Sequence, residues 1–307
     1  MSDFNPVFTQ FLRFFLDAPT SFALLLMVAA AFPMYKFVIE LFKSGVKISL
    51  RVAVIGLPRA GKTTLIAKIF DTIMSTRYAK FMTVNGVETI DRITHYLNII
   101  QSGGGLSPST DNDVFAFRYI YKRAVLGLLT LKYDVEIADF PGEYSESLGS
   151  DLSQQSSFTG LYKKEFFSWI VRADRYVFAV DCEPYLQFDG GDREQYARSI
   201  TLKIKNAVLL LKQELLDESV YSRPCALVFT KADVFEEVTI EADRSNILEA
   251  ELNVKAALDE MLGSFKELIQ FLESNFKSLR VLCHSSKSKR PMFTLGNELL
   301  MKHMSPL

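Results

Sequence analysis

The chain has 307 residues, and 49% of them are hydrophobic, so it can bury a core of substantial size. Its 35 Lys and Arg residues balance 36 Asp and Glu residues, which excludes a protein-wide basic surface, and we expect no nucleic-acid partner. The three cysteines and three histidines form neither a CxxC pair nor an HExxH motif, so a structural zinc site is not expected.

Residues 18–35 form an uncharged apolar run, APTSFALLLMVAAAFPMY. As a helix, this run would be about 27 Å long, close to the hydrocarbon thickness of a bilayer. Only Arg13 carries a positive charge before the run, whereas four Lys or Arg residues follow it between residues 36 and 51. The positive-inside rule then predicts a single-pass anchor with the rest of the chain in the cytosol. The alternative is a helix that lies in the membrane plane or packs against a partner.

Beyond the run, apolar β-forming segments alternate with segments of helical periodicity. The predicted strands are Arg51–Gly56, Val114–Tyr121, Leu131–Asp139, Arg175–Asp181, Ala226–Thr230 and Leu279–His284. The predicted helices are Leu65–Ile73, Tyr162–Arg172, Arg198–Leu216, Ser245–Leu262, Phe265–Phe276 and Leu295–His303. This order predicts an α/β fold with a doubly wound, mostly parallel sheet that contains one antiparallel strand and follows an N-terminal hydrophobic helix.

The first chemical motif is GLPRAGKT at residues 56–63, which fits G-x-x-x-x-G-K-[ST] between a predicted strand and a predicted helix. Its glycines let the backbone fold around phosphates, and the helix N-terminus directs N–H groups at them. Lys62 adds a positive charge, and Thr63 offers a hydroxyl to Mg²⁺. The residues expected to bind phosphates here are Gly56, Pro58, Arg59, Ala60, Gly61, Lys62, Thr63 and Thr64.

Three further motifs each follow a predicted strand, where such sheets bind ligands. The sequence DFPGE begins at Asp139, which can hold Mg²⁺ through water, and its Gly142 can donate its N–H to a γ-phosphate. In TKAD, Asp233 can accept both donors on one edge of guanine, an edge on which adenine lacks that donor pair. The residues expected to bind the base are Thr230, Lys231, Asp233, Ser285, Ser286 and Lys287, the last three forming the SSK motif.

These motifs, in this order, resemble the translation-factor-related class of P-loop GTPases, the Ras, Arf and Era-like group. The polar stretch Glu143–Thr159 resembles the prokaryotic double-GTPase proteins of predicted conflict systems, and this likeness implies a bacterial inner membrane as the location. A membrane helix before the domain is similar in architecture to the signal-recognition-particle receptor β subunit. The resemblance implies GTP or GDP and Mg²⁺ as ligands, and a catalytic site of Lys62, Gly142 and Glu143.

The resemblance also implies a hydroxyl in switch I that reaches Mg²⁺. Thr110 is the best match, with Ser107 and Ser109 as competitors, so the expected metal ligands are Thr63, Thr110 and Asp139. Related enzymes place Gln where this chain has Glu143, and a carboxylate beside a triphosphate is repelled, so equivalence cannot be assumed.

The predicted organisation is an anchor and linker over residues 1–46 and a GTPase domain over residues 47–307, with switch I near 76–112 and switch II near 142–165. The predicted function is a membrane-anchored switch that hydrolyses GTP slowly and signals to a protein effector or activator. A scaffold that holds nucleotide without hydrolysis is the alternative, and a nucleotide-dependent dimer stays open. An ATPase or nucleotide kinase is the third reading, and TKAD argues against it.

Overall fold

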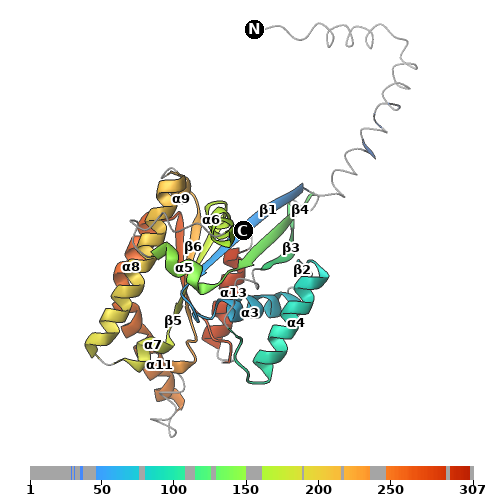
Figure 1. The fold of residues 1–307 in the computed structure, drawn as a ribbon. Coiled ribbons are helices and arrows are strands. Elements are labelled where there is room, and N and C mark those ends of the chain that lie inside the picture. The colour runs from blue at the N-terminus through green and yellow to red at the C-terminus, as the bar shows by residue number, and fades with distance from the viewer. Residues whose placement is uncertain are drawn as a thin grey trace. The chain divides into compact units, whose positions relative to one another are not determined.

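The computed structural model describes residues 46–75, 80–107, 115–125, 129–149, 161–188, 190–215, 218–235, 247–287 and 291–304, together with residues 29, 31, 35 and 36. The chain divides into two compact units, one of Met1–Lys47 with Lys122–Lys132, and one of Ile48–Tyr121 with Tyr133–Leu307. The four isolated residues of the first unit are helical. The second unit carries most of the sheet and every chemical motif described above, whereas the strand ends at residues 46–47, 122–125 and 129–132 belong to the first unit (Figure 1).

The strands are, in chain order, β1 (Val46–Gly56), β2 (Met82–Val84), β3 (Phe115–Val125), β4 (Leu129–Asp139), β5 (Arg175–Asp181), β6 (Pro224–Thr230) and β7 (Ser278–Cys283). The helices before β5 are α3 (Lys62–Met74), α4 (Val87–Gln101), α5 (Gly142–Gly149) and α6 (Leu161–Val171). The later helices are α7 (Glu183–Gln187), α8 (Gly190–Leu215), α9 (Glu218–Tyr221), α11 (Ile247–Ser264), α12 (Lys266–Asn275) and α13 (Pro291–Met304).

The strands form one sheet in the order β2-β3-β4-β1-β5-β6-β7. The pairs β1–β5, β5–β6 and β6–β7 are parallel, and β2–β3 is antiparallel. β3 ends at Val125 and β4 begins at Leu129, a connection too short for the crossover that a parallel pair needs, so β3 also runs antiparallel to β4. The predicted fold class, a mostly parallel sheet with one antiparallel strand, is confirmed.

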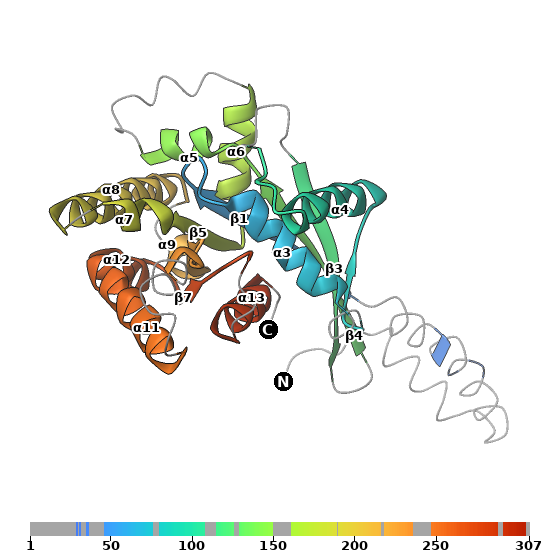
Figure 2. The ribbon, with the colours of Figure 1, turned by 90° about the horizontal axis from the view of Figure 1, so that it is seen from below.

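The apolar side chains of the central strands alternate between two hydrophobic clusters. In β1, Ala53 and Ile55 belong to one cluster, and Val52 and Val54 belong to the other. The first cluster also receives α6, α8, α11 and α12, and the second receives α3, α4 and α13. Figure 2 shows these two groups of helices on opposite sides of the sheet. Strands buried on both faces explain why the predicted strands read as continuous apolar runs.

Several elements differ from those expected. β1 begins at Val46 rather than at Arg51, and α8 begins at Gly190 rather than at Arg198. Helix propensity did not predict the first turns of α8, because the helix begins with two glycines and glycine is a poor helix former. No helix was predicted in the polar stretch Glu143–Thr159, yet α5 begins at Gly142 and covers its start.

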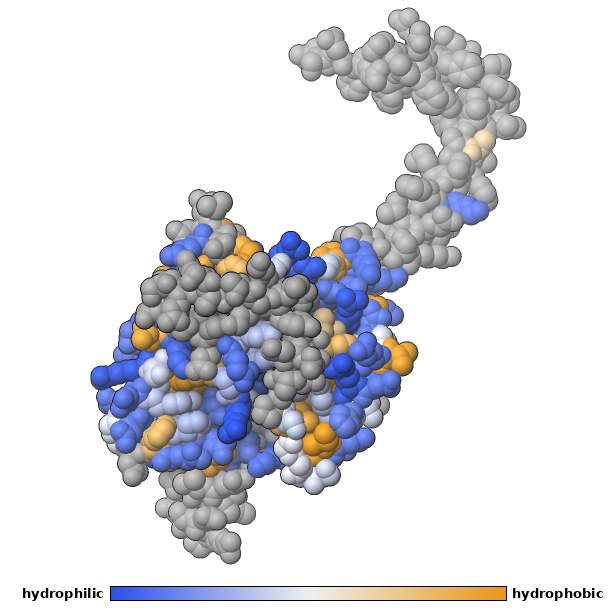
Figure 3. Space-filling view, viewed as in Figure 1, coloured by the Kyte–Doolittle hydropathy of each residue, from blue (hydrophilic) through white to orange (hydrophobic). Residues whose placement is uncertain are grey.

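The predicted membrane localisation needs correction. Among the described residues, no helix combines the length and the apolar character that crossing a membrane requires. The longest described helix, α8, carries charged residues along its length and lies against the sheet. The run 18–35, on which the prediction rested, lies outside the described residues except at positions 29, 31 and 35. On the face seen in Figure 3, the described residues are mainly hydrophilic, with small separate hydrophobic patches.

Candidate functional site

The loop between β1 and α3 folds tightly around the start of the helix. Ala60 N donates to Leu57 O at 3.2 Å, and Leu65 N donates to Gly61 O at 2.8 Å. Arg59 and Gly61 have positive φ angles of 62° and 70°, a region that costs a non-glycine residue about 1–2 kcal/mol. The loop leads directly into α3, whose free N–H groups and dipole attract anions. The local fold is therefore that of a phosphate-binding loop.

Lys62 is buried at the first position of α3. Its Nζ donates to Gly56 O at 2.9 Å and to Leu57 O at 3.1 Å, so the side chain lies along the inside of the loop. Burial lowers the pKa of Lys62 to about 8, although Asp139 and Glu143 act in the opposite direction. The amine thus lies where phosphate oxygens would stabilise its charged form.

Thr63 and Asp139 bring a hydroxyl and a carboxylate together, although they lie far apart in the sequence. Thr63 Oγ1 donates to Asp139 Oδ2 at 2.8 Å, and Asp139 is buried at the end of β4. In the described part of the chain, no three His, Cys, Asp or Glu residues gather to hold a metal. Mg²⁺ does not need such a group, since it binds through one or two carboxylates together with substrate phosphates. The hydroxyl oxygen of Thr63 and the carboxylate oxygens of Asp139 are hard ligands of the kind that Mg²⁺ binds.

The start of α5 lies against the phosphate-binding loop. A Cβ added at Gly142 would lie 2.3 Å from Pro58 Cα, so only glycine fits at this contact. Ser145 Oγ accepts a hydrogen bond from Gly56 N at 3.2 Å, and Ser145 is buried. Glu143, by contrast, is exposed and faces the cavity beside the loop. The start of α5 therefore packs directly against the phosphate-binding loop and is hydrogen-bonded to it.

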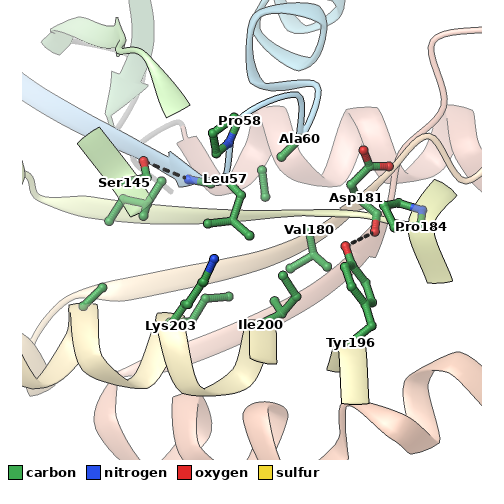
Figure 4. A pocket seen from close by; sticks show the side chains of 15 residues that line it. Leu57, Pro58, Ala60, Ser145, Val180, Asp181, Pro184, Tyr196, Ile200 and Lys203 are labelled. Atoms are coloured by element: carbon green, nitrogen blue, oxygen red, sulfur yellow. Dashed lines mark hydrogen bonds between the residues drawn. The ribbon is translucent and has the colours of Figure 1, made fainter. Parts of the chain in front are cut away.

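A small cavity of about 140 Å³ lies behind the same loop, between the ends of β1 and β5 and helix α8. Figure 4 shows Leu57, Val180 and Ile200 around this space, with Ser145 at one end. At the other end, Tyr196 donates from its hydroxyl to Asp181 O at 2.8 Å. One end of the loop is thus held by Ser145, while a small space remains between the loop and α8.

In front of the loop lies a cavity of about 430 Å³, which we name the phosphate cavity. Its lining residues are Pro58, Arg59, Ala60, Gly61, Lys62, Thr63, Thr64, Gly105, Leu106, Ser107, Gly142, Glu143 and Lys231. The loop, the approach to the predicted switch I, and the start of α5 therefore meet around one space.

A second cavity, of about 390 Å³, lies at the carboxyl ends of β6 and β7, and we name it the base cavity. It is lined by Thr230, Lys231, Asp233, Ser286 and Lys287, among others. Three hydrogen bonds shape it: Thr230 Oγ1 to Ala60 O at 2.8 Å, Ser285 Oγ to Asp233 Oδ1 at 2.7 Å, and Lys287 N to Ser285 Oγ at 3.1 Å. The TKAD loop is thereby tied both to the phosphate-binding loop and to the SSK loop.

Lys231 joins the two cavities and is held by two carboxylates. Its Nζ lies 2.7 Å from Asp181 Oδ2 and 2.7 Å from Glu183 Oε2. Burial opposes its charge, but the hydrogen bonds to Asp181 and Glu183 prevail and raise the pKa of Lys231. The hydrogen bond from Lys231 lowers the pKa of Glu183, whereas burial raises that of Asp181. Lys231 is therefore charged at neutral pH and fixed in position.

The structure thus brings the sequence-predicted phosphate and base residues into one continuous site. Ser107 lines the phosphate cavity, whereas Ser109 and Thr110 lie outside the described residues. Sequence reasoning missed Ser145, Asp181 and Glu183. Asp181 could have been found, because it ends a predicted strand at the edge where ligands bind. Glu183 and Ser145 have no local signal, since each acts on a residue distant in the sequence.

A parallel sheet that carries this phosphate-binding loop and a TKAD loop at one edge has the architecture of a P-loop GTPase domain. Residues 50–282, well over half of the chain, match the family Double-GTPase 2. The chain therefore belongs to the Double-GTPase 2 family, and the predicted likeness to P-loop GTPases and to double-GTPase proteins is confirmed.

Solved structures give weaker likenesses. The GTP-bound GTPase-like domain of Ski7 from S. cerevisiae is 15% identical, with 86% of this chain and 51% of that chain covered and a TM-score of 0.38. The Arl6 small GTPase from Trypanosoma brucei is 10% identical, covering 84% and 99%, with a TM-score of 0.35. Sar1 from Encephalitozoon cuniculi is 12% identical, covering 94% and 95%, with a TM-score of 0.35.

The chain spans about half the length of the Ski7 chain it matches, and likenesses this weak carry no residue role over to it. Among curated proteins, none matches this sequence.

Proposed function

We propose that this chain binds GTP with Mg²⁺, hydrolyses it to GDP and phosphate, and signals to a protein partner through loops around Thr110 and Gly142. The observation that carries the proposal is the pair of joined cavities, one beside the phosphate-binding loop and one beside Asp233. In this proposal, residues 47–307 act as one GTPase domain, with switch I near 76–112 and switch II near 142–165.

The base cavity favours guanine. Asp233 is buried, and Ser285 holds one of its oxygens at 2.7 Å, so its carboxylate has a fixed direction. A carboxylate accepts from both N1–H and the exocyclic amine of guanine, whereas adenine lacks this donor pair. A site whose buried acceptor is left unpaired by the wrong base rejects that base strongly. The stem of Lys231 would form one wall over the base plane.

The phosphate cavity supports transfer of the γ-phosphoryl group to water. Lys62 and the N–H groups of the loop would hold the phosphate oxygens and stabilise the charge that develops on them. Water adds to the γ-phosphorus, the bond to the bridging oxygen breaks, and GDP, phosphate and a proton are released. Thr63, Asp139 and a switch I hydroxyl would hold Mg²⁺. Thr110 is the preferred source of that hydroxyl, with Ser107 and Ser109 as its competitors. Bound Mg²⁺ supplies charge neutralisation at the β- and γ-phosphates.

The role of Glu143 separates the two candidate functions, an enzyme that hydrolyses GTP and a scaffold that only holds it. It is exposed on the wall of the phosphate cavity, next to Gly142, where it can orient the attacking water. Its negative charge also repels the triphosphate, and this favours the second candidate, a protein that holds nucleotide with little hydrolysis. Without an arginine from a partner, turnover of about 10⁻⁴ to 10⁻² per second is expected for the enzyme.

The test is single-turnover hydrolysis of γ-labelled GTP by the full chain with Mg²⁺, with ATP as the control. Phosphate release from GTP and not from ATP supports the enzyme, and a lower rate in Glu143→Ala supports the role of Glu143. Tight GTP binding without phosphate release supports the scaffold. Equal turnover of ATP and GTP contradicts the guanine site.

A further inference from the structure

The phosphate cavity and the base cavity share part of their walls. The residues that line both are Gly61, Thr64, Gly105, Leu106 and Lys231. In a nucleotide, the ribose connects the phosphates to the base. A nucleotide that places its phosphates in one cavity and its base in the other therefore has its ribose at this shared wall, beside Lys231.

Glu183 lies next to that wall. It lines the base cavity, and its Oε2 is 2.7 Å from Lys231 Nζ, so the carboxylate is fixed at the junction of the two cavities. Its side chain is 45% exposed, which leaves it open to a ligand. Its other oxygen, Oε1, makes no hydrogen bond or ion pair with any residue in the described part of the chain.

The chemistry of this oxygen matches the ribose. An ionised carboxylate only accepts hydrogen bonds, and the 2′- and 3′-hydroxyl groups of a ribose are donors. A carboxylate serves this purpose in other nucleotide-binding sites, where it accepts from a ribose hydroxyl. Since Lys231 already holds one oxygen of Glu183, little side-chain freedom is lost when the other oxygen binds a ligand.

We propose that Glu183 accepts a hydrogen bond from the ribose diol of the bound nucleotide, so that the site selects ribonucleotides over deoxyribonucleotides. This inference rests on the proposed guanine-nucleotide site and adds a specificity residue to it. The competing role for Glu183 is a positioning role alone, in which it holds Lys231 and never contacts the ligand.

The experiment measures the affinity of the full chain for GDP, 2′-deoxy-GDP and 3′-deoxy-GDP by isothermal titration calorimetry. A charge-assisted hydrogen bond predicts that at least one deoxy analogue binds about tenfold or more weakly than GDP. In Glu183→Ala, the affinity for GDP should fall by more than the affinity for that analogue, so that the affinity ratio falls to about 1–2. Asp181→Asn is the matched control, because it alters the other carboxylate on Lys231 and should weaken all three ligands while keeping the ratio.

Equal binding of GDP and both analogues by the unaltered protein overturns the inference. So does a ratio that persists in Glu183→Ala, or an equal loss for all three ligands in that variant, which identifies the positioning role. These outcomes differ from failure of the proposed function. If the proposed function is wrong, the unaltered protein binds neither GDP nor GTP, and the inference about Glu183 is wrong as well.

Discussion

Replacing Gly142 with alanine is expected to push α5 away from the phosphate-binding loop. The new Cβ would lie 2.3 Å from Pro58 Cα and 2.4 Å from Pro58 N, and both are backbone atoms that cannot rotate away. Ordinary carbon contacts begin at about 3.5 Å, so the two segments must separate by roughly 1 Å. The hydrogen bond from Gly56 N to Ser145 Oγ, already 3.2 Å long, would break when they separate.

The expected cost follows from these two effects. Overpacking costs about 1–3 kcal/mol, and a lost hydrogen bond costs about 1 kcal/mol, giving roughly 2–4 kcal/mol. At about 2–4 °C per kcal/mol for a domain of this size, the melting temperature should fall by roughly 4–16 °C. Because Gly142 also lines the phosphate cavity, the rate of GTP hydrolysis should fall as well.

Gly263→Ala is the matched control for this prediction. Gly263 lies in α11, and a Cβ there would meet nothing within 4 Å. Alanine in a helix is more favourable than glycine by about 0.5–1 kcal/mol, so this variant should melt at the same temperature as the unaltered protein or slightly higher. Scanning calorimetry of the unaltered protein and the two variants measures their melting temperatures. If Gly142→Ala melts at the same temperature as Gly263→Ala, the close contact with Pro58 does not exist in solution.

The remaining predictions concern the nucleotide. Asp233→Asn should shift the preference from GDP toward XDP, because an amide donates to the 2-oxo group of xanthine, and competition binding that shows no shift would remove the base assignment. Ser285→Ala should weaken GDP binding about five- to thirtyfold, since Asp233 Oδ1 loses its partner, and unchanged affinity in calorimetry would contradict this. The pKa of Lys62 is lowered to about 8 by burial, and phosphates would raise it again, so GDP binding at pH 8.5–9 should take up a proton. Calorimetry in two buffers of different ionisation enthalpy measures that proton uptake. GDP binding by Lys62→Met should show no such uptake.

The strands that carry the site were predictable because their burial on both faces leaves long apolar runs in the sequence. The predicted segment Arg175–Asp181 is β5 to the residue, and the predicted ends of β6 and β4, at Thr230 and Asp139, match the structure. Since the motifs follow these strand ends directly, the sequence was enough to bring them to one edge of the sheet. Strand starts were less accurate, because β1 continues into the less apolar stretch before Arg51.

Side-chain pairings across the fold could not be read from sequence. Ser145 looks like any polar residue after Gly142 until the fold places it beside Gly56 N. Glu183 gains its position only from Lys231, which arrives from another strand. The membrane prediction was wrong for a different reason. It rested on the hydropathy and length of residues 18–35 and on the charges that flank them, and these features do not distinguish a spanning helix from other apolar segments.

The two cavities differ in charge, and this difference would orient a nucleotide. In the base cavity, Lys231 is paired with Asp181 and Glu183, and Lys287 lies 3.9 Å from Asp233, so little positive charge is left uncompensated. The phosphate cavity has Lys62, Arg59 and the N-terminus of α3, opposed by Asp139 and Glu143. An anion therefore finds its best place at the loop, where backbone N–H groups add to the lysine. The base cavity must select its ligand by hydrogen bonds, because attraction between net charges is weak there.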